Sequence, residues 1–236
     1  MDKKIRQAQY EVLEAFSRAK SGFALSGGTA LELYYLHHRF SWDLDFFSPE
    51  YDLKEIDRLV SVFSKFLKVR IKLDSEFLSS NRAKVRFYIL DIPGSARPLK
   101  IDFVEDVIFD ILPAKSFNGA QVYGVENIYM QKICAITGTT LKPDEIGRET
   151  TQGRNETRDA FDIYMLSKKI KPLYLYLKKI PAAQQRGLIH WYRTFSRQDL
   201  KLSLLDLDIY DKNFDPREMI IYLEGQIKKF TKEVME

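Results

Sequence analysis

Residues 25–47, LSGGTALELYYLHHRFSWDLDFF, constrain the fold of this chain more than any other stretch. The pattern predicts a short strand at 23–25, a glycine turn, a helix over Thr29–Phe40 and a strand carrying Asp43 and Asp45. Side chains alternate between the two faces of a strand, so both carboxylates would point the same way. The apolar residues around them would anchor that strand in the core. The stretch therefore predicts two converging acids at the lip of a sheet.

The glycine turn adds a second kind of chemistry beside the acids. Backbone N–H groups at Gly27 and Gly28 can approach a phosphate closely, and a helix N-terminus adds partial positive charge. Paired carboxylates favour a hard divalent cation. Each signal alone is weak, and a second Asp-x-Asp, Asp206 and Asp208, lacks a preceding glycine turn, so we interpret it as solvated loop. The order of the elements predicts a joint site for a nucleoside triphosphate and metal.

A third carboxylate is expected from PLKIDFV, residues 98–104. Asp102 interrupts an apolar strand pattern there, which is costly unless the charge is paired or bound to metal. The alternative is an acid that caps a turn at the strand end. Asp106 and Asp110 follow where the strand should already be ending, and we leave both out of the site.

These residues resemble a known family. GGTAL, followed by Arg39, Ser41, Asp43 and Asp45, is similar to the first motif of the minimal nucleotidyltransferase fold related to DNA polymerase beta. Within that fold it resembles the AbiEii/AbiGii-type toxins of bacterial toxin–antitoxin and abortive-infection systems. The resemblance covers most of the chain. It implies an α+β fold class, with a nucleotidyltransferase-fold mixed sheet, flanking helices and a helical C-terminal region.

The resemblance also implies roles for individual residues. Asp102 matches the second motif, Lys132 lies where the third motif has a phosphate-contacting lysine, and residues 157–166, TRDAFDIYML, are similar to the fourth. Either Asp159 or Asp162 could complete the site, and position within the motif favours Asp159. The implied catalytic residues are Asp43, Asp45, Asp102, Lys132 and Asp159, of which the first three would bind metal. The implied nucleotide-binding residues are Ser26, Gly27, Gly28, Thr29, Arg39, Ser41 and Lys132.

Charge is unevenly distributed in the C-terminal half. The net charge is only +4, yet residues 163–198 contain no Asp or Glu and many Lys, Arg and aromatic residues. Such a surface suits phosphate contacts and base stacking. The candidate RNA-binding residues are Lys168, Lys169, Lys178, Lys179 and Arg186. The alternative is a helical region whose aromatic residues form the core and whose lysines face solvent.

Apolar patterning predicts the organisation of the rest. Strands are expected near residues 23–25, 43–47, 69–73, 83–91 and 98–104. The expected domains are an α/β core with its motif helix at 1–136, a flexible polar loop at 137–157 and a helical domain at 158–236. A loop of this length is usually functional or disordered, so we expect a flap that orders on a substrate or partner.

Composition limits the cellular context. At 236 residues and 45% hydrophobic content the chain can bury a substantial core. One cysteine, Cys134, excludes an intramolecular disulfide and fits a reducing compartment. No apolar run is long enough to span a bilayer, and the N-terminus has no signal-peptide pattern. The expected location is the cytoplasm.

The resemblance implies a Mg²⁺-dependent enzyme, with two ions, that transfers a nucleotide from a nucleoside triphosphate to RNA. The implied acceptor is the 3′ end of a transfer RNA, whose modification blocks translation, and the implied partner is a cognate antitoxin. Two alternatives remain open at this point: a nucleotidyltransferase that modifies a protein or small-molecule hydroxyl, and a non-catalytic RNA- or protein-binding module on the same fold. The sequence does not select the nucleotide base or the oligomeric state.

Overall fold

The computed structural model describes residues 2–79, 83–139, 141–143, 149–151, 153–154 and 156–235. The chain forms two compact units. The first comprises Met1–Tyr35 and Phe40–Asn127, and the second comprises Leu36–Arg39 and Ile128–Glu236. Within the described ranges, no helix combines the length and apolar character that a membrane span requires.

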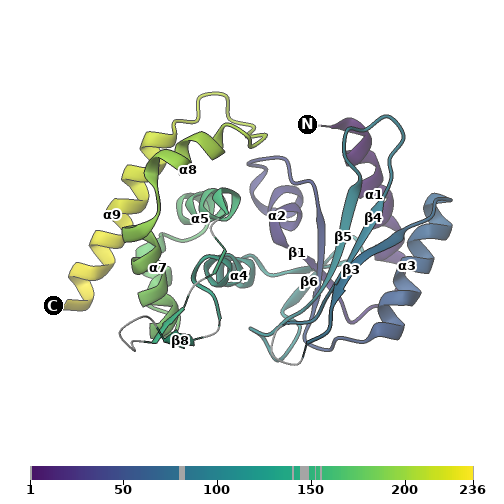
Figure 1. The fold of residues 1–236 in the computed structure, drawn as a ribbon, viewed down its shortest axis with the longest axis horizontal. Coiled ribbons are helices and arrows are strands. Elements are labelled where there is room, and N and C mark those ends of the chain that lie inside the picture. The colour runs from purple at the N-terminus through teal and green to yellow at the C-terminus, as the bar shows by residue number, and fades with distance from the viewer. Residues whose placement is uncertain are drawn as a thin grey trace. The chain divides into compact units, whose positions relative to one another are not determined.

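A seven-stranded mixed sheet forms the centre of the first unit (Figure 1). Its strand order is β3-β4-β5-β2-β1-β7-β6. The pairs β2–β5 and β1–β7 are parallel, and the other neighbouring strands are antiparallel. The strands are β1 Ala24–Ser26, β2 Leu44–Ser48, β3 Lys72–Phe77, β4 Val85–Leu90, β5 Leu99–Glu105, β6 Ala114–Phe117 and β7 Ala120–Tyr123.

The predicted α+β class is confirmed, and β1, β2, β4 and β5 lie within two residues of the strands expected from the sequence. The strand expected near 69–73 is displaced, because β3 begins at Lys72 and continues to Phe77. The hairpin β6–β7 was not predicted. Each of its strands has only four residues, too few for a clear alternation of apolar side chains. The available signal was the Asn118-Gly119 dipeptide, whose two residues both have positive φ, as a tight hairpin turn requires.

Helices cover both faces of this sheet. Figure 1 shows α1 (Lys3–Arg18) and α3 (Leu53–Leu67) side by side on one face, and α2 (Gly27–Ala30) on the other. Between α1, α3 and the sheet, the ring of Phe46 lies 4.6 Å from Phe16 and 5.9 Å from Phe63. Because Phe46 belongs to β2, this aromatic core determines which face of β2 is buried.

The helix expected at Thr29–Phe40 is shorter than predicted. After α2 the chain continues as a π-helical segment, η1 (Leu31–Leu36), and then leaves the helix at His37, whose φ is 46°. The backbone of the next two residues bonds within the second unit: the carbonyl of His38 accepts from the amide of Tyr210, and Arg39 forms a β-bridge with Ile209. These long-range hydrogen bonds therefore end the helix earlier than its apolar pattern predicts.

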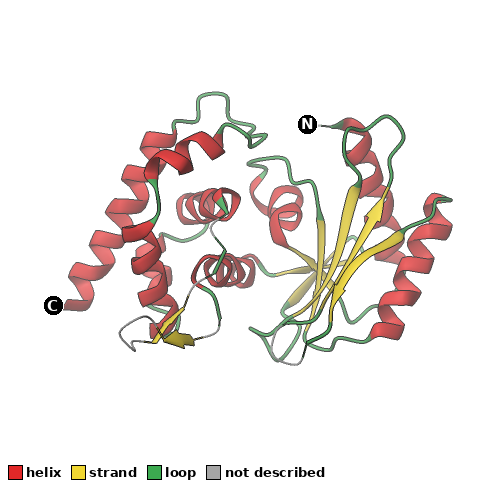
Figure 2. Ribbon diagram, in the orientation of Figure 1, coloured by secondary structure: helices red, strands yellow, loops and turns green. Residues whose placement is uncertain are grey.

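The second unit is mainly helical in its described part (Figure 2). Its helices are α4 Val125–Thr137, which begins in the first unit, α5 Thr157–Lys169, α6 Leu173–Leu177, α7 Ala182–Thr194, α8 Arg197–Leu204 and α9 Pro216–Met235. The second unit resumes at Ile128, so most of α4 belongs to it. The sequence instead predicted that the α/β core continues to residue 136. The expected polar loop at 137–157 contains a hairpin of β8 (Leu141–Pro143) and β9 (Glu149–Thr151). Residues 140, 144–148, 152 and 155 of that loop lie outside the described residues.

Asp162 on α5 is the centre of a buried ion cluster in the second unit. Its carboxylate accepts from Arg39 Nε at 2.7 Å and Nη2 at 2.8 Å, and from His38 Nε2 at 2.8 Å. Lys132 Nζ on α4 lies 2.8 Å from the same carboxylate. Burial would raise the pKa of Asp162, but the neighbouring cations hold it well below its usual range. This carboxylate joins the 36–39 segment to α4 and α5.

Replacing Asp162 by Asn should leave Arg39 buried without its carboxylate. Removing one partner of a buried ion pair costs about 3–5 kcal/mol, so we expect a fall of that size in the free energy of unfolding. Urea unfolding followed by circular dichroism measures it. The matched control is Asp206→Asn, at an exposed position of the same unit, which should change the free energy by less than about 0.5 kcal/mol. Equal effects of the two variants would contradict the assigned role of Asp162.

His38 should make this unit sensitive to mild acid. Burial lowers the pKa of His38 below the ordinary histidine value of 6.5, outweighing the opposing effect of Asp162. Below pH 6.5 the unfolded chain therefore binds a proton that the folded chain does not, and the free energy of unfolding falls as the pH decreases. His38→Gln should flatten this pH dependence, whereas His190→Gln, at an exposed position, should retain it. Thermal unfolding at several pH values between 5 and 8 checks the difference, and identical profiles would contradict the assignment.

Candidate active site

Two of the predicted acids lie side by side on neighbouring strands. In the parallel pair β2–β5, Asp45 is in register with Asp102, so both side chains project from the same face of the sheet. Both residues are half-buried. Their neighbours Phe46 and Phe103 are fully buried on the opposite face, with ring centroids 5.4 Å apart. Burial of these apolar neighbours therefore orients the acids toward the opposite face of the sheet.

Asp43 lies just before the first residue of β2. Its side chain is half-buried, and its backbone carbonyl accepts a hydrogen bond from Thr29 Oγ1. Thr29 follows the glycine pair and is fully buried. This bond fixes the chain at Asp43 relative to the start of α2. A side chain next to the glycine turn therefore holds the two ends of the first motif together.

The glycine turn contacts the acids directly. Gly27 has a φ of +69°, a conformation that favours glycine, and a Cβ at this position would overlap the Oδ2 atom of Asp45. The preceding residue, Ser26, is in register with Asp45 in the antiparallel pair β1–β2. One row across the sheet therefore contains Ser26, Asp45 and Asp102. Only a residue without a side chain allows the turn to lie against the Asp45 carboxylate.

This donor set fits a magnesium ion that also binds phosphate. Magnesium usually takes one or two carboxylates and fills its other positions with water and phosphate oxygens. The pair Asp45 and Asp102 provides such carboxylates, and Asp43 supplies another nearby in the sequence. Among the residues that the structure describes, no three acidic, His or Cys side chains form a preassembled metal cluster. The metal role of these three acids therefore remains a prediction.

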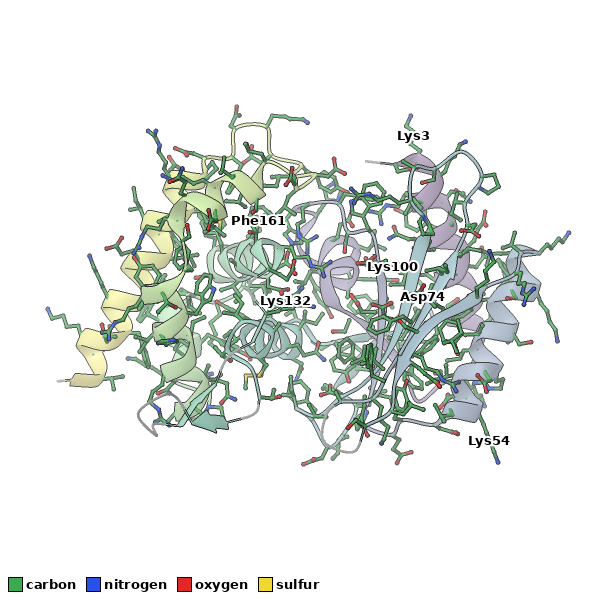
Figure 3. The ribbon with its side chains drawn as sticks, in the orientation of Figure 1. Lys3, Lys54, Asp74, Lys100, Lys132 and Phe161 are labelled. Carbon is green, nitrogen blue, oxygen red and sulfur yellow. The ribbon has the colours of Figure 1, made fainter. Side chains whose placement is uncertain are left out.

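Lys132 and Asp159, the two candidates from the later motifs, pair with each other in the second unit. Lys132 Nζ lies 2.8 Å from Asp159 Oδ1, and both side chains are buried. Arg154 Nε also donates to Asp159, at 2.6 Å. Burial would raise the pKa of Asp159, but Lys132 and Arg154 hold it below its usual range. Lys132 therefore links Asp159 to Asp162, and its contact with phosphates remains a prediction (Figure 3 labels Lys132).

The nucleotide-binding roles predicted for Arg39 and Ser41 are also untested. Arg39 is 3% exposed, and its guanidinium holds Asp162 through two hydrogen bonds. The backbone amide of Ser41 donates to Glu32 Oε2 at 2.8 Å. Glu32 is ion-paired with Arg6 of α1 in the core of the first unit. Sequence reasoning missed this pair, although an acid inside the apolar run LELYYL was the signal that a buried partner was needed.

The predicted RNA-binding residues are exposed on α5, α7 and the end of α6. All five side chains are exposed, namely Lys168, Lys169, Lys178, Lys179 and Arg186. Some have local partners: Lys178 forms an ion pair with Glu233, and Lys168 donates to the Tyr164 hydroxyl at 3.3 Å. Several aromatic residues of this segment are in the core instead of on the surface, namely Tyr164, Tyr176, Tyr192 and Phe195. Those rings are unavailable for base stacking, and RNA binding by the five exposed cations remains a prediction.

Comparisons with known proteins identify a family and a fold. The family model described as "Nucleotidyl transferase AbiEii toxin, Type IV TA system" matches residues 11–220. A presumed nucleotidyltransferase from H. pylori has a similar structure, with a TM-score of 0.58, 17% sequence identity and coverage of 98% of both chains. The protein JHP933 from Helicobacter pylori has a TM-score of 0.56 and 18% identity, covering 98% of this chain and 93% of that one.

At such identities the structural likeness shows the fold alone. A comparison with curated proteins finds no significant match. The family model, however, spans most of the chain, including all four motifs. This protein therefore belongs to the AbiEii family of nucleotidyl transferase toxins from type IV toxin–antitoxin systems.

Proposed function

We propose that this protein is a toxin that transfers a nucleoside monophosphate from a nucleoside triphosphate to RNA in the cytoplasm. The proposed acceptor is the 3′ end of a transfer RNA, whose modification would block translation. The observation that carries the proposal is the row of Ser26, Asp45 and Asp102, with Gly27 lying against the Asp45 carboxylate. It brings together two acids and a glycine turn of the kind that can bind phosphate. Membership of the family also implies a cognate antitoxin.

Each group in the row has a distinct task in this reaction. The amides of the Gly27-Gly28 turn bind the triphosphate, and Asp43, Asp45 and Asp102 would hold magnesium. Bound magnesium supplies charge neutralisation of the phosphates and lowers the pKa of a coordinated hydroxyl. Asp102 lies on β5, which is the strand of this row farthest from the turn, and is proposed to face the attacking hydroxyl. In-line attack forms a new bond to the α-phosphorus and releases pyrophosphate.

The later motifs would supply further charge for the same reaction. Lys132 is proposed to contact the nucleotide phosphates as a point charge, a role that suits lysine. Asp159 is proposed as the acid that completes the site, because its position in the motif favours it. Both acids are buried, but one partner of Asp159, Arg154, is half-exposed, whereas Arg39, His38 and Lys132 around Asp162 are all buried. In this role Asp159 would position Lys132, to which it is already paired.

The test incubates the purified protein with each labelled nucleoside triphosphate, Mg²⁺ and total bacterial RNA. Transfer of label to small RNA, dependent on Mg²⁺, supports the proposal. Label on protein or on a small molecule, with none on RNA, would identify a different acceptor. Absence of transfer to any acceptor, together with retained RNA or protein binding, would favour a non-catalytic module.

Asp45→Asn and Asp102→Asn should each abolish transfer, because each removes one carboxylate from the acidic pair. The fold should persist, since removing one of two neighbouring acids relieves their mutual repulsion. Transfer to RNA and the thermal midpoint are measured together. Asp110→Asn is the matched control at an exposed position of the same unit and should keep full activity. Full activity of either test variant would disprove the metal assignment.

Gly27→Ala should abolish transfer as well, for a steric reason. The added Cβ meets Asp45 Oδ2, and a positive φ costs a non-glycine residue about 1 kcal/mol. The Asp45 carboxylate must then move away from the turn. Gly225→Ala in α9 is the matched control, because a Cβ there has nothing within 4 Å. That control should retain activity and gain up to about 1 kcal/mol of helix stability. Normal transfer by Gly27→Ala would show that the contact between turn and acid is dispensable.

A further inference from the structure

An open hollow lies on the same sheet face as the acids. Its volume is about 210 Å³, and residues of three neighbouring strands line it. These residues are Asp74 and Ser75 of β3, Phe87, Tyr88 and Ile89 of β4, and Lys100 of β5. Figure 3 labels Lys100 and Asp74 on these strands. Of the residues that line it, only Lys100 belongs to a segment identified in the sequence, PLKIDFV, in which Asp102 alone was given a role.

Strand register places this hollow next to Asp102. In the antiparallel pair β4–β5, Phe87 is the direct partner of Asp102. Lys100 lies two residues before Asp102 on β5, so its side chain projects from the same face. The row of Ser26, Asp45 and Asp102 therefore continues to Phe87. The hollow begins about one strand spacing, ~4.8 Å, from the third acid.

The floor of the hollow offers an aromatic surface. Phe87 is half-buried, and the ring of Phe77 lies 6.1 Å from it at an interplanar angle of 82°. Phe77 is 61% exposed on β3, which is the edge strand of the sheet. Large exposed apolar side chains gathered near a site are typical of ligand-binding surfaces. The ring of Phe87 can therefore stack on a base, while Phe77 lies beside it edge-on and outside the lining of the hollow.

Two charged residues, Lys100 and Asp74, line the hollow together with Phe87. Lys100 is exposed, and a lysine beside an aromatic ring is the combination that binds phosphate and base together. A β-bulge between Leu73 and Ser75 interrupts the regular pairing at Asp74, which lines the hollow. Bulges often re-aim a side chain next to an active site. The Asp74 carboxylate can accept hydrogen bonds from the amino group of a base.

We propose that this hollow binds the 3′-terminal nucleotide of the RNA acceptor, an inference that rests on the proposed function. The base stacks on Phe87, the phosphate on its 5′ side pairs with Lys100, and the terminal hydroxyl faces Asp102. The glycine turn and the hollow flank the acids on opposite sides, because β1 and β4 lie on either side of the β2–β5 pair. In-line displacement requires that the attacking and leaving oxygens are opposite each other.

The reaction at this subsite balances without a further reactant. The terminal hydroxyl oxygen forms a bond to the α-phosphorus, and its proton passes to the Asp102 carboxylate. The bond between the α-phosphorus and the bridging oxygen breaks, and pyrophosphate leaves with that electron pair. An aromatic floor with a single cation favours nucleic acid over a protein acceptor, because any base can stack while one phosphate is paired.

The experiment uses the full chain and three variants: Phe87→Leu, Phe87→Tyr and Lys100→Gln. Binding of a fluorescein-labelled single-stranded RNA pentamer with a free 3′ hydroxyl is measured by anisotropy, and transfer to RNA gives kcat and KM. Mg²⁺-dependent binding of a non-hydrolysable nucleoside triphosphate analogue is measured in parallel. Matched controls are Phe66→Leu and Lys54→Gln, both on α3, where Phe66 is 37% exposed and Lys54 is exposed.

We expect Phe87→Leu to raise the RNA Kd and the acceptor KM about tenfold, as loss of one stacked base does. Phe87→Tyr should stay within about twofold of the unaltered protein, because it keeps the ring. Lys100→Gln should lower the slope of log K against log salt by about 0.7, the value for one phosphate contact on a single strand. Binding of the triphosphate analogue should not change in any variant.

Other results would overturn the inference in distinguishable ways. Transfer to RNA with unchanged RNA Kd and KM in Phe87→Leu and Lys100→Gln would disprove this subsite and leave the proposed function intact. Equal loss of triphosphate binding would assign the hollow to the nucleotide donor. Label transferred only to a protein would overturn the RNA acceptor. If no RNA is labelled but both variants lose RNA binding, the hollow stands as an RNA site and the proposed reaction fails.

Discussion

The pairing of β2 with β5 is the constraint on which the candidate site depends. Side chains alternate along both strands, so burial of Phe46 and Phe103 against α1 and α3 forces Asp45 and Asp102 onto the other face. A shift of either strand by one residue would bury its acid and expose its ring. The same hydrophobic contacts that stabilise the sheet therefore bring the two carboxylates together. The glycine turn adds to this arrangement, because only glycine fits against Asp45.

Buried charge organises the second unit in the way that buried aromatic rings organise the first. Asp162 accepts from Arg39 and His38 and contacts Lys132, while Lys132 also pairs with Asp159. Buried ions contribute little net stability when paired, but an unpaired one is costly. Because separating these ions would leave them buried and unpaired, their contacts hold the 36–39 segment against α5 and α4. Residues that resemble later catalytic motifs therefore also have a structural function, which must be separated from any catalytic one.

Sequence reasoning predicted the fold class well, and its reasons were physical. The order of strand, glycine turn, helix and acids needs only local spacing, and the chain follows it from β1 to β2. Errors arose where tertiary contacts override local pattern. The helix after Gly28 ends at Leu36 instead of Phe40, because His38 and Arg39 bond to Tyr210, Ile209 and Asp162 far along the chain. The hairpin β6–β7 was missed because short strands carry little periodicity.

The sequence by itself determined the residue types and local spacing of the first motif, because the glycine turn and the acids lie within one short stretch. Only the tertiary structure decided which strands lie side by side, because hydrogen-bonded partners such as Asp45 and Asp102 are distant in sequence. It also decided that several aromatic residues of the basic segment are core, while Phe87 and Phe77 line an open sheet face. Burial depends on packing partners that a single sequence does not name, so exposed and buried rings look alike until the chain is folded.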